Sequence, residues 1–101
     1  MPEAEPKILC QTPTPGKQPT SISKWKYDLV RAAILDILPA DDEGIEFKIL
    51  PNLVRDQLSP DQRAALGSIS WHTTTVKLDM EVKGDIARVP GSSPQRLRRL
   101  I

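Results

Sequence analysis

The sequence predicts a mainly α-helical domain that carries a small β-hairpin at its C-terminal end. Three observations support this fold class. Apolar residues recur every three or four positions from Tyr27 to Leu38, which is the spacing of an amphipathic helix. The stretch "SPDQ" at residues 59–62 matches a helix-capping box. Near the C-terminus, a turn of Pro, Gly and Ser separates two short runs, as in a hairpin.

The 101 residues have room for one small domain, which we expect over residues 23–101. Residues 1–22 are expected to form an extended Pro/Thr-rich arm, because proline excludes helix and inner strand. Only "KILC" at residues 7–10 is apolar enough to dock on the domain. Cys10 is the single cysteine, which fits a reducing setting. No apolar run approaches the length of a membrane span, so we expect a soluble, cytoplasmic protein without a membrane partner.

The first helix is expected to begin after Ser23, a suitable N-cap, and to end before Pro39. An acidic turn at residues 40–44 and a very short strand at residues 45–47 follow. A second helix is expected around residues 48–58, with its proline in the first turn.

The capping box predicts the start of a short third helix. It places Ser59 at the N-cap, Pro60 at the first helical position and Gln62 at N3. Gly67 predicts the end of this helix. After Gly84, the runs "IARV" and "QRLRRL" around "PGSSP" predict a hairpin.

Residues 73–83 fit either a strand or a helix. Val76, Leu78, Met80 and Val82 alternate with charged residues, which favours a half-buried strand. Eleven residues are about twice the usual length of a strand, however, and Gly84 is placed to end a helix.

With a helix here, the element order is that of a winged helix-turn-helix domain with three to four helices and a C-terminal wing. With a strand, the chain would end in a three-stranded meander. Three stretches resemble a family of small, functionally uncharacterised bacterial proteins: "PGK" at 15–17, "KYDLVRAAILDILP" at 26–39 and "WHTTTVKLDMEVKGDIARV" at 71–89. The resemblance covers most of residues 12–99. That family is similar to winged helix-turn-helix domains, which implies a helix at residues 73–83 and a wing after it.

Helical spacing gives this predicted helix two apolar faces. Ile69, Val76 and Met80 share one face, and Trp71, Leu78 and Val82 share a roughly opposite one. Trp71 is expected in the core, covered by the wing and the arm; otherwise the second face is a dimer or partner surface. An exposed strip is expected between the two faces, formed by Thr74, Lys77 and Glu81.

The distribution of charge favours a basic C-terminal end, although the formal net charge is only +1. Residues 84–101 hold four arginines against one aspartate, a net charge of +3, whereas residues 24–44 sum to −2. A winged helix presents its third helix and its wing to DNA. The candidate DNA contacts are therefore His72, Thr73, Thr74 and Lys77 on the helix and Arg88, Ser92, Ser93, Gln95, Arg96 and Arg98 on the wing.

Catalytic and metal-binding patterns are missing from the sequence. One histidine and one cysteine cannot form a Cys/His metal cluster, and no phosphate-binding glycine loop or nucleophile motif occurs. We therefore expect no enzyme, no cofactor and no small-molecule substrate. The leading hypothesis is a regulatory protein that binds duplex DNA. The alternative is a protein-interaction or dimerisation module that uses Trp71, Leu78 and Val82.

Overall fold

The structure of the protein is a computed structural model that describes residues 6–14 and 16–101. Residues 1–5 and 15 of the expected arm lie outside the described residues. In chain order the elements are β1 (Lys7–Cys10), β2 (Thr20–Ser23), α1 (Lys24–Ile37), β3 (Ile45–Glu46), the 3₁₀ helix η1 (Phe47–Ile49), α2 (Leu50–Gln57), α3 (Pro60–Leu66), α4 (Ile69–Lys83), β4 (Ile86–Arg88) and β5 (Arg96–Arg99).

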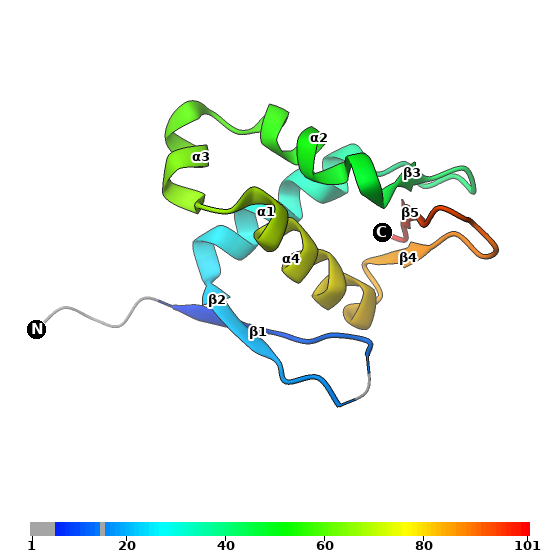
Figure 1. The fold of residues 1–101 in the computed structure, drawn as a ribbon, viewed down its shortest axis with the longest axis horizontal. Coiled ribbons are helices and arrows are strands. Elements are labelled where there is room, and N and C mark those ends of the chain that lie inside the picture. The colour runs from blue at the N-terminus through cyan, green and yellow to red at the C-terminus, as the bar shows by residue number, and fades with distance from the viewer. Residues whose placement is uncertain (1–5, 15) are drawn as a thin grey trace, which may run out of the picture.

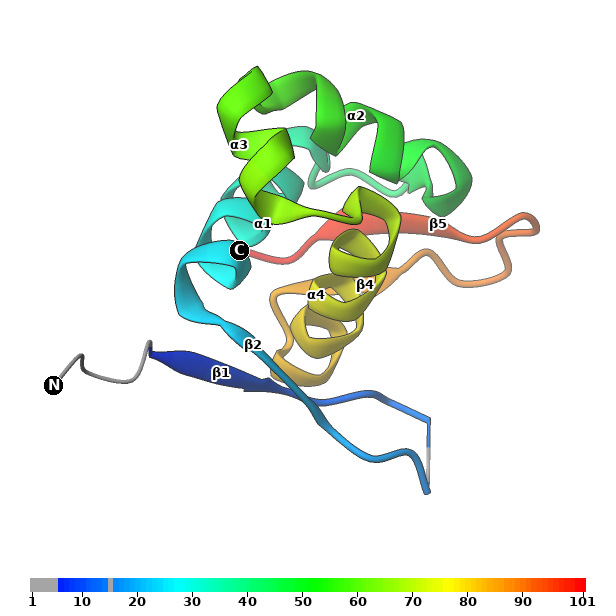
Figure 2. The same cartoon turned by 60° about the vertical axis from the view of Figure 1, so that its left-hand side comes forward.

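The fold is an α+β arrangement in which α4 occupies the centre. Figure 1 shows α2 and α3 on one side of α4 and the β1–β2 hairpin on the other, with β4 and β5 continuing from its C-terminal end. Figure 2 shows the same arrangement after rotation, with the β1–β2 hairpin again beside α4. Helix α4 packs against both α1 and α2. These neighbours leave one side of α4 facing outward between the two β-hairpins.

Local signals set the boundaries of the helices. Ser23 precedes α1, and Leu38, just before the proline, ends it. The proline of α2 lies in its first turn, as expected. In the capping box of α3, the Ser59 hydroxyl accepts the Gln62 N–H at 3.1 Å, while the Gln62 side chain accepts the Ser59 N–H at 2.8 Å. Each of these boundaries confirms the sequence prediction.

Helix α4 settles the ambiguity at residues 73–83 in favour of a helix. The Ser68 hydroxyl caps its start by accepting the Trp71 N–H at 3.2 Å. Gly84 ends it in the left-handed conformation, with φ of 81°, and its N–H returns to the last-turn carbonyls. The alternation of apolar and charged residues that favoured a strand was therefore misleading.

The C-terminal strands form an antiparallel three-stranded sheet in the order β3-β5-β4. Leu97 of β5 lies opposite Ile45 on one side and Arg88 on the other. Gly44 is required where the chain enters β3: its φ is +62°, and a Cβ there would lie 2.5 Å from the Leu97 carbonyl oxygen. The predicted hairpin is confirmed, with the short strand β3 added to its outer edge.

The N-terminal segment forms a second, two-stranded antiparallel sheet. Its register pairs Ile8 with Ile22 and Cys10 with Thr20. Cys10 and Ile22 are 3% and 5% exposed, so this hairpin buries one face against α1 and α4. "KILC" was the one stretch of the arm considered apolar enough to dock, and in the structure it packs on the domain with Cys10 buried.

The hydrophobic core joins residues of both sheets and all four helices. It consists of Cys10, Ile22, Tyr27, Val30, Ala33, Ile34, Leu38, Leu50, Val54, Leu58, Leu66, Val76, Met80, Ile86 and Leu97. Val76 and Met80 lie on the predicted core face of α4, and both are completely buried. Within the described residues, no helix is long and apolar enough to span a membrane.

Candidate functional site

The structure places most of the predicted helix contacts in the interior of the protein. Thr73 is fully buried, Lys77 is 2% exposed and His72 is 8% exposed. Thr74 is half-buried. The expected exposed strip of Thr74, Lys77 and Glu81 was therefore wrong. The reason is that η1 and β4 cover the side of Lys77 and Glu81 through Phe47 and Arg88, and no local pattern predicts such contacts.

Lys77 illustrates how a lysine is accommodated inside this fold. Its ammonium lies 3.1 Å from Glu81 Oε2 and 4.5 Å from the centroid of the Phe47 ring. Burial lowers the pKa of Lys77, and the neighbouring Glu81 carboxylate opposes that shift. Arg88 donates from Nε to the other oxygen of Glu81 at 2.8 Å. Lys77 and Arg88 thus share one carboxylate, and neither is an unpaired cation.

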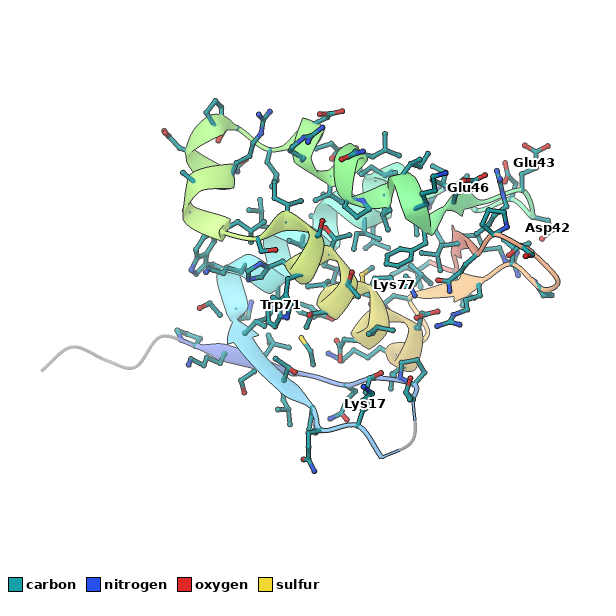
Figure 3. The ribbon with its side chains drawn as sticks, viewed as in Figure 1. Lys17, Asp42, Glu43, Glu46, Trp71 and Lys77 are labelled. Carbon is teal, nitrogen blue, oxygen red and sulfur yellow. The ribbon has the colours of Figure 1, made fainter. Side chains whose placement is uncertain are left out.

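The wing arginines also have acceptors within the chain. Arg96 donates to the Glu43 carbonyl at 2.6 Å and lies 3.4 Å from the Glu46 carboxylate. Arg98 donates to the Asp42 carboxylate at 3.1 Å. Figure 3 shows these three acidic residues gathered at the wing end of the molecule. The carboxylates of Asp42, in the acidic turn, and Glu46, on β3, thus offset part of the positive charge of the C-terminal hairpin.

The remaining wing candidates have local structural contacts or lie at the tip. The Ser92 hydroxyl donates to the Val89 carbonyl at 2.8 Å and accepts the Arg96 N–H at 3.0 Å. These two bonds stabilise the turn between β4 and β5. Ser93 is exposed, whereas Gln95 is half-buried and its carbonyl accepts the Phe47 N–H. The C-terminal hairpin therefore carries an exposed serine and the paired Arg96 and Arg98, whereas Arg88 shares the Glu81 carboxylate with the buried Lys77 of α4.

An apolar stripe runs along the outward side of α4. We define the α4 stripe as Trp71, Thr75, Leu78 and Val82, which follow helical spacing. Trp71 is 46% exposed and Val82 is 47% exposed, while Thr75 and Leu78 are half-buried. The expectation that Trp71 lies in the core was wrong: the C-terminal and N-terminal hairpins flank α4 and do not cross over this side. The labelled side chains in Figure 3 show Trp71 near the start of α4, away from the wing.

A buried carboxylate joins the N-terminal hairpin to the helices. Asp79 is fully buried and accepts hydrogen bonds from the Tyr27 hydroxyl at 2.5 Å and the Gln11 N–H at 2.9 Å. The Lys83 ammonium, about one helical turn further along α4, lies 2.7 Å from the same carboxylate. Burial alone would raise the pKa of Asp79, but the donors from Gln11, Lys83 and Tyr27 outweigh it and hold this pKa below its usual value. We call this group the Asp79 clamp.

The Asp79 clamp was missed by sequence reasoning because its donors are remote. Tyr27 and Gln11 are separated from it by 52 and 68 positions. The only local signal was the acid-first spacing to Lys83, which indicates a surface pair on any helix. A buried carboxylate whose two oxygens accept hydrogen bonds from other segments holds those segments together. Among residues 6–14 and 16–101, no three His, Cys, Asp or Glu side chains gather in a group that could hold a metal ion.

These features define a small α+β domain in which the outward side of one central helix lies between two β-hairpins. The chain belongs to the family of unknown function DUF6958, whose pattern it matches over residues 7–97. A search of curated proteins finds no match, and neither does a search of solved structures.

Proposed function

We propose that this protein is a non-enzymatic interaction module of winged-helix architecture, and that its α4 stripe docks against a second copy of the chain. The element order supports the winged-helix assignment: a first helix, a short strand, further helices, a long helix and a two-stranded wing. In this assignment α4 is the helix that a winged-helix domain displays. Its outward side is therefore the natural place for a partner.

The inverted polarity of α4 carries the proposal. The helix buries a lysine, an aspartate and a threonine, Lys77, Asp79 and Thr73, each with 2% exposure or less. It exposes nearly half of Trp71 and Val82. A helix whose outward side met only water would show the opposite distribution. Exposed apolar side chains aligned on one helix favour a protein interface.

The stripe suits a second copy because it is self-complementary. In an antiparallel pair of α4 helices, Trp71 of each chain faces Val82 of the other, and Thr75 faces Leu78. This is the reciprocal pattern that a two-fold interface requires. The four stripe positions carry no charge, so no like charges meet along the centre of the pair. The 15 residues of α4 give the contact a length of about 22 Å.

Sedimentation equilibrium tests this proposal on the full chain. We expect a dimer whose population rises between about 1 µM and 1 mM, the range in which weak complexes dissociate. Leu78→Asp and Val82→Glu should each raise the dissociation constant at least about 100-fold, because each buries an unpaired charge. Ile49→Asp is the matched control, since Ile49 is 42% exposed on η1. A monomer at every concentration, or a dimer indifferent to both stripe variants, would refute the proposal.

Duplex DNA is a second candidate because the wing arginines keep exposed side chains. Arg88 is 52% exposed, Arg96 38% and Arg98 32%, each in an ion pair. The pairs of Arg96 and Arg98 are exposed on both partners and contribute about 0–1 kcal/mol each, so phosphate groups could displace these carboxylates. The test is titration of random-sequence duplex DNA against salt. Affinity that falls steeply with salt and is lost in Arg96→Ala and Arg98→Ala would support DNA binding. The absence of binding at low salt would exclude it.

A further inference from the structure

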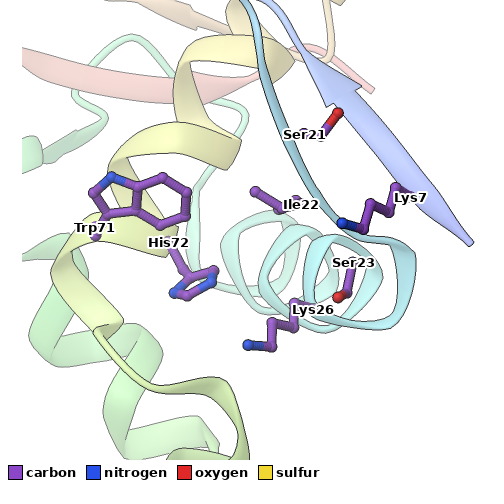
Figure 4. A pocket seen from close by; sticks show the side chains of 7 residues that line it. All are labelled: Lys7, Ser21, Ile22, Ser23, Lys26, Trp71 and His72. Atoms are coloured by element: carbon purple, nitrogen blue, oxygen red, sulfur yellow. The ribbon is translucent and has the colours of Figure 1, made fainter. Parts of the chain in front are cut away.

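A polar pocket lies where the start of α4 meets the start of α1 and the N-terminal hairpin. Its volume is about 190 Å³, which is sufficient for one small polyatomic group. Figure 4 shows side chains from three elements around it: Lys7 from β1, Lys26 from α1, and Trp71 and His72 from α4. Ser21, Ile22 and Ser23 of β2 complete the lining.

The lining is cationic and contains no carboxylate among the described residues. Lys24, Lys77 and Lys83 each lie within 3.1 Å of an acidic side chain. Lys7 and Lys26, by contrast, form no ion pair with the described part of the chain; Lys26 approaches only the Trp25 ring, 5.6 Å from its centroid. Two lysines that line one pocket without a described carboxylate give it a positive potential, which an anion would neutralise.

His72 gives this pocket a second recognition group. The imidazole is more than nine-tenths buried, and its Nδ1 lies 2.6 Å from the Ser68 carbonyl oxygen. A carbonyl only accepts, so Nδ1 carries a proton, and Nε2 is the ring nitrogen left for a ligand. The pocket therefore combines two ammonium donors with an imidazole nitrogen that can share a proton with a ligand.

That combination distinguishes among anions. Sulfate and carboxylates are fully ionised at neutral pH and have no proton to share with Nε2. A phosphate monoester has its second pKa at about 6 and carries about −1.5 to −2 charges at pH 7. It can accept from both lysines and also share a proton with the imidazole. The start of α1 reinforces the preference for an anion, because the helix dipole is positive there and its first turn contains no acidic residue.

We propose that this pocket binds a terminal phosphoryl group, with Lys7 and Lys26 holding its oxygens and His72 Nε2 sharing a proton with it. The indole of Trp71, 4.8 Å from the His72 ring in an edge-to-face arrangement, forms an apolar wall for the rest of the ligand. The phosphoryl group is that of a monoester. A phosphodiester, such as the backbone of a nucleic acid, carries a single charge and lacks the second ionisable oxygen.

Solution NMR of the full chain tests the assignment through the Trp71 indole N–H and the His72 ring resonances. Inorganic phosphate and glycerol phosphate should shift both resonances saturably, with dissociation constants in the millimolar range or tighter. Sulfate, acetate and dimethyl phosphate at equal ionic strength should bind at least about tenfold more weakly. Lys7→Ala and Lys26→Ala should each weaken phosphate binding about tenfold, the loss of one charge-assisted hydrogen bond.

Lys48→Ala is the matched control, because Lys48 is an exposed lysine on η1 outside the pocket; it should change the affinity less than twofold. Unchanged unfolding midpoints show that the lysine variants remain folded. The proposal is overturned if no shift saturates, if sulfate binds as well as phosphate, or if Lys48→Ala weakens binding as much as the pocket variants do. Shifts with dimethyl phosphate equal to those with glycerol phosphate would overturn the monoester preference.

Discussion

Replacing Asp79 by asparagine should weaken the attachment of the N-terminal hairpin more than any other single isosteric change. The carboxylate is fully buried and joins three segments through Tyr27, Gln11 and Lys83. Asparagine preserves the volume but removes the charge and replaces one acceptor oxygen by a donating NH₂ group. At least one of the three donor groups must then lie against the NH₂ group of asparagine, which is itself a donor.

The size of the effect follows from the exposure of each partner. A hydrogen bond to a charged group contributes about 1.5–3 kcal/mol. The Lys83 side chain is 45% exposed, so water replaces most of what it loses. The weakened hydrogen bonds from Tyr27 and Gln11 therefore account for most of the destabilisation. Part of it is offset, because asparagine avoids the cost of burying a charge. We expect Asp79→Asn to lower the free energy of unfolding by about 2–3 kcal/mol at pH 7. In a domain of this size, that is a fall in Tm of roughly 10 °C or more.

The effect should depend on pH in a defined direction. The native protein holds the pKa of Asp79 below its ordinary value, which is about 3.9 in an unfolded chain. The ionised carboxylate therefore stabilises the native state fully above about pH 5, and this stabilisation is lost as the pH falls through the lower native pKa. Asparagine does not titrate, so the difference between wild type and Asp79→Asn should be constant from pH 7 to 5 and shrink in more acidic solution.

Urea unfolding monitored by tryptophan fluorescence between pH 7 and 2.5 measures both the size and the pH dependence. Asp56→Asn is the control, since that carboxylate is 67% exposed and should change the free energy of unfolding by less than about 0.5 kcal/mol. A loss below 1 kcal/mol for Asp79→Asn at pH 7 would refute the reasoning. So would a loss of the same size at every pH.

Two further predictions concern the turn before β3 and the thiol of β1. Gly44→Ala should lower the free energy of unfolding by at least about 2 kcal/mol, because its Cβ would meet the Leu97 carbonyl at 2.5 Å. Gly84→Ala, with a similar φ but open space around it, should cost about 1 kcal/mol; equal urea midpoints would contradict the close contact. Burial raises the pKa of Cys10 to about 11, so at pH 8 this thiol should react with Ellman's reagent at least about 100-fold more slowly in the native protein than in urea. Comparable rates would show that β1 is not docked.

The parts of the fold that the sequence predicted are those with local causes. The capping box at Ser59 and the left-handed stop at Gly84 act within one turn of their own helices. Pro39 excludes helix wherever the rest of the chain lies. Such signals give the order of elements and most of their boundaries. They do not say which side of a helix the next element will cover.

The burial of α4 could not be predicted from its own residues. Lys77 is buried because Phe47 and Arg88, distant in sequence, lie beside it. Asp79 is buried because the hairpin brings an N–H to it. The helical positions of these residues were predicted correctly, yet charge alone suggested that Lys77 would face water. The pocket was missed for the same reason, since Lys7 and His72 meet only in the folded chain.

The inverted polarity of α4 also explains why its sequence resembled a strand. A helix covered on several sides and apolar on its outward side needs apolar residues around most of its circumference. Met80 serves the core and Val82 the outward side, and together they produce an alternation with period two. Lys77 and Asp79 occupy the intervening positions. Glu81 neutralises the charge of Lys77, and Lys83 neutralises that of Asp79. An ordinary surface helix would avoid the cost of burying these charges. Helix α4 buries charged side chains at this cost and at the same time exposes Trp71 and Val82. This combination supports the proposal that its outward side binds another molecule.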